Sequence, residues 1–123
     1  MADPNRTHRQ VLKFALTLPE AWEDHPWEET VVKVGKKIFV FMGSEEGPAH
    51  PAIHVKLRDS HEQAMAVPDT EPTGYGLGKS GWVTVPLATA RPLPLGVLTD
   101  WVEESYRLIA PKKLVAELDA GIR

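Results

Sequence analysis

The sequence predicts an α+β fold in which an antiparallel β-sheet is covered by helices in a two-layer arrangement. Near both ends of the chain, apolar residues recur at the spacing of amphipathic helices. The middle of the chain instead holds short segments rich in Val, Ile and Phe, separated by turn-forming residues. This order of elements is typical of a sheet with helices packed against it. The chain has 123 residues, and we expect residues 1–123 to form a single domain.

The first helix is expected to begin at Asp3-Pro4. Asp3 can cap the helix, and Pro4 at its first position loses no amide hydrogen that the helix needs. Pro19 ends the pattern, because proline cannot donate to the helical hydrogen-bond ladder. Residues 20–27 have no clear period, so we expect an ordered loop there. The helical stripe consists of Val11, Leu12, Ala15, Leu16 and Leu18.

Residues 29–34 and 37–42 predict a β-hairpin closed by Gly35-Lys36. Glycine at the first turn position favours a type II′ turn, which needs a positive φ there. In that register Val34 pairs with Lys37 and Val32 with Phe39. The expected core face then carries Val32, Val34, Phe39 and Phe41, and the other face carries Val31, Lys33, Ile38 and Val40. The second face is unusually apolar for a solvated surface, so we expect it to be covered or to bind something.

The remaining elements follow from shorter patterns. Residues 53–58 alternate cleanly, which places Val55 inside and His54, Lys56 and Arg58 outside. A short helix is expected after Asp59, a strand at residues 82–85, and an amphipathic helix over residues 94–109 that Pro111 ends. A final short helix follows. We expect one core that contains Val32, Phe39, Val55, Trp82 and Leu98.

Composition excludes several classes of protein. The chain has no cysteine, so it has no disulfide, thiolate nucleophile or zinc–thiolate site. Its net charge of −3 excludes a strongly basic protein that total charge alone would hold on nucleic acid. No apolar run approaches the roughly 20 residues of a membrane helix, and the polar N-terminus lacks a signal-peptide pattern. We therefore expect a cytoplasmic protein without membrane association.

Residues 76–81 form a literal G-x-G-x-x-G sequence. A dinucleotide site needs such a loop to follow a strand and to open a helix, whereas here a Pro/Gly loop precedes it and the strand at residues 82–85 follows. We therefore predict a glycine-rich turn that leads into a strand. An anion nest of backbone amides near Lys79 remains as a weaker alternative.

No catalytic or metal site is expected. The histidines at positions 8, 25, 50, 54 and 61 show no metal-ligand spacing, and solvated or locally bonded histidines are the simpler interpretation. Ser80 is the one tempting nucleophile, but it lies in no G-x-S-x-G elbow, so the protein is expected not to be an enzyme. An acidic run surrounds His25 and could hold a cation, although a solvated loop is favoured. It comprises Glu20, Glu23, Asp24, Glu28 and Glu29.

Positive charge is concentrated in the hairpin and the following strand. Residues 31–60 carry a net charge of +2, between segments of −3 and −2 that complete the total of −3. A two-stranded ribbon can enter a DNA major groove, with lysines on the phosphates. A solvated sheet face with a lysine-protected edge is the alternative. The candidate nucleic-acid-binding residues are Lys33, Lys36, Lys37, Lys56 and Arg58.

Five spaced motifs resemble the MmcQ/YjbR-like family, over about residues 7–119. The first is Leu18-Pro19 followed by Trp-Glu-Asp-His-Pro-Trp at 22–27, and the second is Val-Lys-Val-Gly-Lys-Lys-Ile-Phe at 32–39. The others are Val-Lys-Leu at 55–57, Gly-Lys-Ser-Gly-Trp-Val at 78–83 and Ser-Tyr-Arg-Leu-Ile-Ala-Pro-Lys-Lys at 105–113.

The resemblance implies a small bacterial cytoplasmic protein with a CyaY-like arrangement of helices on an antiparallel sheet. Members of the family are commonly labelled DNA-binding proteins, and the resemblance implies no catalytic residue and no cofactor. DNA is therefore the expected partner, and we expect a monomer. The CyaY-like fold also suggests iron binding at the acidic run, although fold alone does not carry function.

A second hypothesis is a non-enzymatic domain that binds a small ligand or another protein. Its site would combine the polar and aromatic residues that match the family motifs. These are His25, Trp27, Lys56, Lys79 and Trp82.

Overall fold

The computed structural model describes residues 3–26, 29–43, 51–74 and 76–121. Six strands form one antiparallel sheet in the order β1-β2-β3-β4-β6-β5. The strands are β1 (Ala21–Asp24), β2 (Thr30–Val34), β3 (Lys37–Gly43), β4 (Ala52–Lys56), β5 (Glu71–Pro72) and β6 (Trp82–Pro86). The helices are α1 (Pro4–Ala15), α2 (His61–Met65), the 3₁₀ helix η2 (Leu77–Ser80), α3 (Leu95–Ile109) and α4 (Lys112–Asp119).

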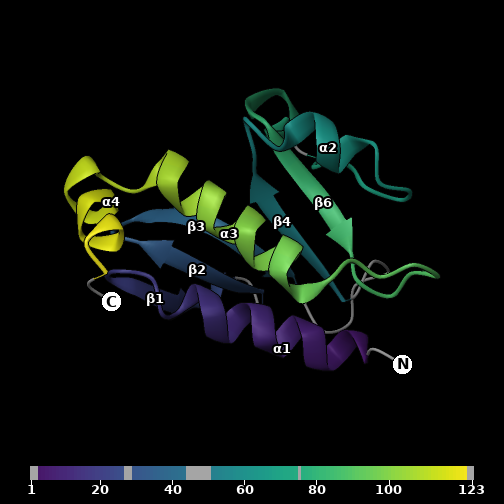
Figure 1. The fold of residues 1–123 in the computed structure, drawn as a ribbon, viewed down its shortest axis with the longest axis horizontal. Helices are drawn as coiled ribbons and strands as arrows, with labels where there is room; N and C mark the ends of the chain where they lie inside the picture. The colour runs from purple at the N-terminus through teal and green to yellow at the C-terminus, as the bar shows by residue number, and fades with distance from the viewer. Residues whose placement is uncertain (1–2, 27–28, 44–50, 75, 122–123) are drawn as a thin grey trace.

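Helices α1 and α3 lie side by side across one face of the sheet (Figure 1). The predicted two-layer α+β fold is therefore confirmed. Asp3 caps α1 by accepting a hydrogen bond of 3.0 Å from the Asn5 amide, and Pro4 occupies the first turn, as expected. The helices and the sheet enclose the core between them, and the opposite face of the sheet is not covered by α1 or α3 (Figure 1).

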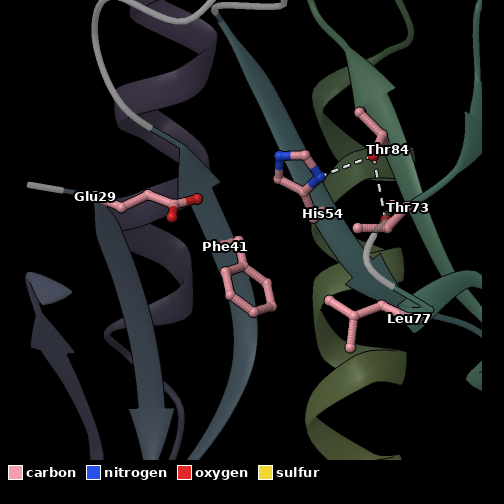
Figure 2. A pocket seen from close by; sticks show the side chains of 7 residues that line it. Glu29, Phe41, His54, Thr73, Leu77 and Thr84 are labelled. Carbon is pink, nitrogen blue, oxygen red and sulfur yellow. Dashed lines mark hydrogen bonds between the residues drawn. The ribbon is translucent and has the colours of Figure 1, made fainter. Parts of the chain in front are cut away.

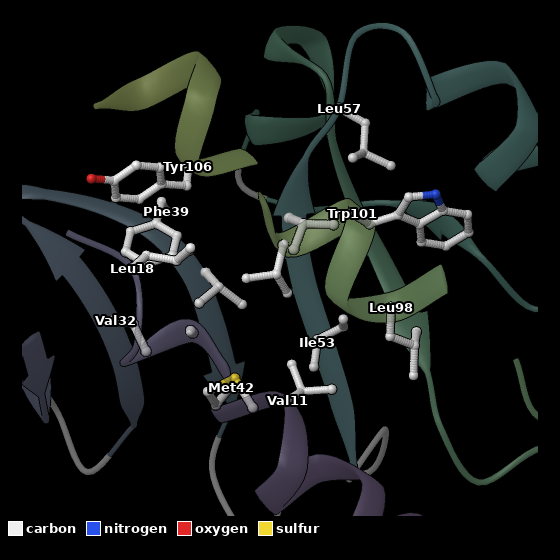
Figure 3. Packing of buried hydrophobic residues seen from close by; sticks show 14 of the residues in the cluster. Val11, Leu18, Val32, Phe39, Met42, Ile53, Leu57, Leu98, Trp101 and Tyr106 are labelled. Atoms are coloured by element: carbon white, nitrogen blue, oxygen red, sulfur yellow. The ribbon is translucent and has the colours of Figure 1, made fainter. Parts of the chain in front are cut away.

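The core forms where α1 and α3 meet the sheet (Figure 3). Val32, Phe39, Val55 and Leu98 are fully buried there, as the sequence predicts. Trp82 is also buried, but outside this cluster, because its side chain lies on the opposite face of the sheet and packs against Phe41 at a ring-centroid distance of 5.2 Å.

Two expectations about the strands were wrong. Residues 21–24 form the edge strand β1, paired with β2, rather than a loop. In the hairpin, the two pairs nearest the turn are as predicted, but Val32 pairs with Val40 instead of Phe39. Phe39 is an extra residue on β3, a bulge that shifts the following side chains by one position. Val40 therefore joins the core, and Phe41 faces the other way.

Ser105 on α3 bonds to the bulged residue. Its hydroxyl donates to the Phe39 carbonyl at 2.5 Å and accepts from the Lys56 amide at 2.9 Å. The hydroxyl thus stands between β3 and β4 at the point where a direct ladder bond would otherwise form. Ser105 is fully buried, so neither backbone group can turn to water.

The residues on either side of Ser105 anchor two further segments. The Glu104 carboxylate accepts hydrogen bonds from the Arg58 amide at 2.8 Å and from the Ser60 hydroxyl at 2.7 Å. Tyr106 donates its hydroxyl proton to the Pro19 carbonyl at 2.7 Å and meets the Phe39 ring edge-on. Three consecutive side chains of α3 therefore hold the sheet, the turn after β4 and the turn before β1.

Replacing Ser105 by alanine should lower the free energy of unfolding by about 1–3 kcal/mol, because the buried Lys56 amide and Phe39 carbonyl lose their shared partner. Urea denaturation measures the change. Thr99→Ala is the matched control, since that hydroxyl bonds only within the same helix, to the Gly96 carbonyl at an exposed position. Equal effects of the two variants would contradict the bridging role.

The stabilising contribution of Glu104 should depend on pH. Burial alone would raise the pKa of this carboxyl, but the hydrogen bonds from Ser60 and from the Arg58 and Ser60 amides outweigh burial and hold the pKa below its ordinary value of 4.5. The contribution is therefore complete above pH 4.5 and is lost as the pH falls through the lower pKa of the folded state. Wild type and Glu104→Gln should accordingly differ in unfolding free energy at pH 7, and the difference should shrink as the pH falls through the folded-state pKa. A constant difference would show that ionisation is not involved.

Candidate functional site

The face of the sheet opposite α1 and α3 carries the candidate site, and we call it the open face (Figure 1). Directly paired residues share a face, so the register defines its members. They include Trp22, Asp24, Val31, Lys33, Ile38, Phe41, His54, Lys56, Trp82 and Thr84. Ile38, Phe41 and His54 are half-buried, and Trp22 is 44% exposed. The sequence-based expectation of an unusually apolar second face is therefore met, with Phe41 in place of Val40.

Two of the five candidate DNA-binding cations have acidic partners. The Lys33 ammonium lies 2.7 Å from the Asp24 carboxylate and 5.2 Å from the Trp22 ring centroid. The hydrogen bond from Lys33, together with one from the His25 amide, holds the pKa of Asp24 below its ordinary value. Arg58 is exposed and lies 3.3 Å from Asp59. Part of the positive charge predicted for this region is therefore already balanced.

The other candidate cations gather at one end of the sheet, where β2 and β4 finish and β3 and β6 begin. Lys36 and Lys37 are exposed at the hairpin turn, and Lys56 is half-buried beside Trp82. Within the described ranges, none of these three lysines forms an ion pair. Lys79 of η2 is exposed just before β6. We call Lys36, Lys37, Lys56 and Lys79 the basic end.

The residues of the second hypothesis do not form one cluster. Lys56 and Trp82 are direct neighbours across β4 and β6, and Lys79 lies three residues before Trp82. His25 instead follows the edge strand β1, where its ring lies 2.6 Å from the Glu23 carboxylate. Three strand spacings separate β1 from β4, or about 14 Å at 4.8 Å each. Trp27 lies outside the described residues.

A cavity of about 200 Å³ opens on the open face beside this cluster (Figure 2). Its lining comprises Glu29, Phe41, His54, Thr73, Gly74, Leu77 and Thr84. The alternation of residues 53–58 correctly places His54 outward, but no motif in the sequence marks His54 as a site residue. The signal that could have identified the site is Phe41, which the predicted register hid in the core.

Hydrogen bonds hold His54 in a defined orientation. Its Nδ1 lies 2.8 Å from the Thr84 hydroxyl, which in turn lies 3.1 Å from the Thr73 hydroxyl. Phe41 meets the imidazole edge-on at a centroid distance of 6.1 Å. Burial among these groups lowers the pKa of His54 below 6.5, because the charged imidazolium loses hydration. His54 is therefore neutral at pH 7 and can both donate and accept hydrogen bonds.

The glycine-rich segment 76–81 is the predicted turn that leads into a strand. It forms the 3₁₀ helix η2, and β6 follows directly. Gly81 has a φ of 96°, and a Cβ there would lie 2.7 Å from the Leu57 carbonyl oxygen. That carbon would collide with backbone, so glycine is required at this position by the close approach of two segments. Its function is structural in this fold.

The acidic run does not assemble a metal centre in the part of the chain that the structure describes. No group of three or more His, Asp or Glu side chains is placed there to hold an ion. Glu28 of the run and His50 lie outside the described residues. Asp24 bonds to Lys33, and Glu23 bonds to His25.

The longest described helix, α3, has 15 residues, and none of the described helices has the length and hydropathy that spanning a bilayer requires.

Comparison with known families gives one clear result. The model of the YjbR family matches residues 16–108, a stretch that includes all six strands and nearly all of α3. No match was found among curated proteins. Because the matched region covers about three-quarters of the chain and both the basic end and the cavity, the chain belongs to the YjbR family.

Proposed function

We propose that this protein is a non-catalytic DNA-binding domain that contacts phosphates with its basic end. The observation that carries the proposal is the pair of exposed lysines at the hairpin turn, Lys36 and Lys37, which form no ion pair with any described residue. Lysine binds phosphate as a point charge and needs no fixed geometry, so a turn at the edge of a sheet is sufficient. Family membership supports the same conclusion.

Trp22 supplies a second contact beside the turn. Its indole N–H donates to the Gly35 carbonyl at 2.9 Å, which ties the exposed ring to the hairpin tip. Gly35 has a φ of 60° and Lys36 has no positive φ, as a type II′ turn requires. The Trp22 ring is therefore held next to the turn that carries Lys36 and Lys37. A phosphate backbone at the tip would lie within reach of both charge and aromatic surface.

DNA binding by the basic end should show a moderate dependence on salt. If Lys36, Lys37, Lys56 and Lys79 each meet one phosphate, the slope of log affinity against log salt is about −3.6 for duplex DNA. Raising salt from about 50 to 200 mM should then weaken binding about a hundredfold. Gel shifts with random duplex over a salt series measure the slope. A slope near −5 would require Lys33 and Arg58 as well, and would contradict their assignment as paired cations.

A charge reversal at the hairpin tip should abolish the shift. The double variant Lys36→Glu, Lys37→Glu places repulsion where the phosphates would lie, and exposed turn lysines contribute little to folding. The matched control is Arg6→Glu with Arg9→Glu, which makes the same change in net charge on exposed positions of α1, over the other face. Absence of a wild-type shift at about 20 mM salt, or equal loss in both double variants, would reject DNA binding by this surface.

Small-ligand binding is a second candidate function, and the cavity at His54 is the specific observation in its favour. Its volume of about 200 Å³ suits a ligand of few atoms. The lining contains none of the four lysines of the basic end. Variants in the cavity and variants at the hairpin tip can therefore test the two functions separately.

The environment of the cavity predicts the titration of His54. Its ring protons, followed by NMR, should show a midpoint below 6.5. Because the folded-state pKa is the lower one, stability is complete above pH 6.5 and declines as the pH falls through the folded-state pKa. His54→Gln should lack this decline in unfolding free energy and serves as the control. A midpoint at or above 6.5 would show that the cavity is open to solvent.

A further inference from the structure

We propose that the cavity at His54 binds the positively charged end of a small organic amine. This inference rests on the second candidate function, small-ligand binding, and assigns its ligand class. It is independent of DNA binding, because the cavity and the basic end share no residue.

Charge is the first argument. Glu29 is the single carboxylate among the seven lining residues, and the lining includes no lysine or arginine. Figure 2 shows the Glu29 carboxylate extending toward the side of the cavity that His54 occupies. The side chain is half-buried, so its field is screened less than that of a solvated acid. The cavity therefore attracts a cation and repels a phosphate or a carboxylate.

The aromatic and apolar walls provide the second argument. Phe41 lies between Glu29 on one side and His54 and Leu77 on the other (Figure 2). Trp82 fixes the Phe41 ring by an edge-on contact with a centroid distance of 5.2 Å. An ammonium group near a phenyl face gains from the negative charge of the ring quadrupole. Leu77 offers an apolar contact for the alkyl part of the same ligand.

His54 completes the site as a hydrogen-bond acceptor. When the proton is on Nδ1, the imidazole donates to Thr84, and Thr84 can donate in turn to Thr73. The lone pair of Nε2 is then free for a donor, and Figure 2 shows this nitrogen on the side away from Thr84. An ammonium group has three donors, of which one can meet Glu29 and another His54. An amine therefore selects this tautomer on binding.

The donor atoms of the cavity do not suit the main competing ligand, a metal ion. Among the described residues that line the cavity, Glu29 and His54 alone carry a strong metal donor, and no described cluster of three such residues exists. Two donors from the protein leave a divalent ion bound mostly by water. An organic cation loses less on leaving water and gains from Phe41 and Leu77. The combination of one acid, one neutral acceptor and apolar walls fits an amine best.

The test uses three probes of similar size and different charge, namely butylamine, butanol and butyrate. Each is titrated into the ¹⁵N-labelled full chain at pH 7.5, with backbone amides and the His54 ring followed by NMR. Butylammonium should give saturable shifts at Phe41, His54 and Thr84, in the millimolar range that so small a ligand permits. Butanol should bind at least tenfold more weakly, because it lacks the charge that Glu29 recognises. Butyrate should give no saturable shift.

Glu29→Gln should weaken butylammonium binding at least tenfold, since it removes the charge and keeps the shape. Glu62→Gln, an exposed change on α2 outside the cavity, is the matched control and should leave binding unchanged. Equal affinity of butanol and butylammonium at these resonances would overturn the amine assignment but leave small-ligand binding intact. If no probe gives a saturable shift, the amine assignment and small-ligand binding are both overturned. If only Glu62→Gln loses butylammonium binding, the amine binds near α2 and not in the cavity at His54.

Discussion

The buried hydroxyl of Ser105 determines how the two halves of the sheet meet. Because it bonds to both Phe39 and Lys56, these two residues do not pair directly, and the pairing of β3 with β4 begins at Val40 with Val55 and continues at Phe41 with His54. The resulting bulge at Phe39 turns Phe41 from the core to the open face. Phe41 then forms a wall of the cavity and covers Trp82. A hydrogen bond on the helix side of the sheet thus lies next to the residues that form the cavity on the other side.

Caps, apolar spacing and turn residues in the sequence were sufficient to predict the two long helices and the hairpin turn. The Asp3 cap and the apolar stripe located α1, and the apolar stripe and Pro111 located α3. The turn chemistry of Gly35 located the hairpin and its first two pairs correctly. The register beyond those pairs includes the bulge at Phe39, whose carbonyl bonds to Ser105, 66 residues away in the sequence. No local pattern contains that information. Residues 21–24 show no apolar period, and they form the edge strand β1. Their strand conformation depends on pairing with β2, which the residues themselves do not reveal.

The candidate site was predicted only in part for the same reason. Counting charges located the basic segment, but the pairing of Lys33 with Asp24 depends on a strand that the sequence did not predict. Alternation placed His54 outward, yet the cavity also needs Thr73 and Leu77, which reach it because β5 and η2 pack along β6. Family motifs identified Lys56, Lys79 and Trp82, which do lie near one another, and also His25, which does not.

The net charge of −3 is a weaker objection to DNA binding than it appears from composition. Asp24 and Asp59 bond to Lys33 and Arg58, and each such pair removes one cation and one anion from the field that a phosphate meets. At physiological ionic strength, charges more than about 8 Å apart are largely screened in solution, so only the nearest groups decide whether a phosphate is attracted. At the hairpin tip, Lys36 and Lys37 are exposed and form no ion pair with any described residue, and the exposed Glu20 lies next to Ala21, which pairs with Val34 beside the turn. Local pairing, rather than the total charge, therefore determines which end of this sheet can hold a polyanion.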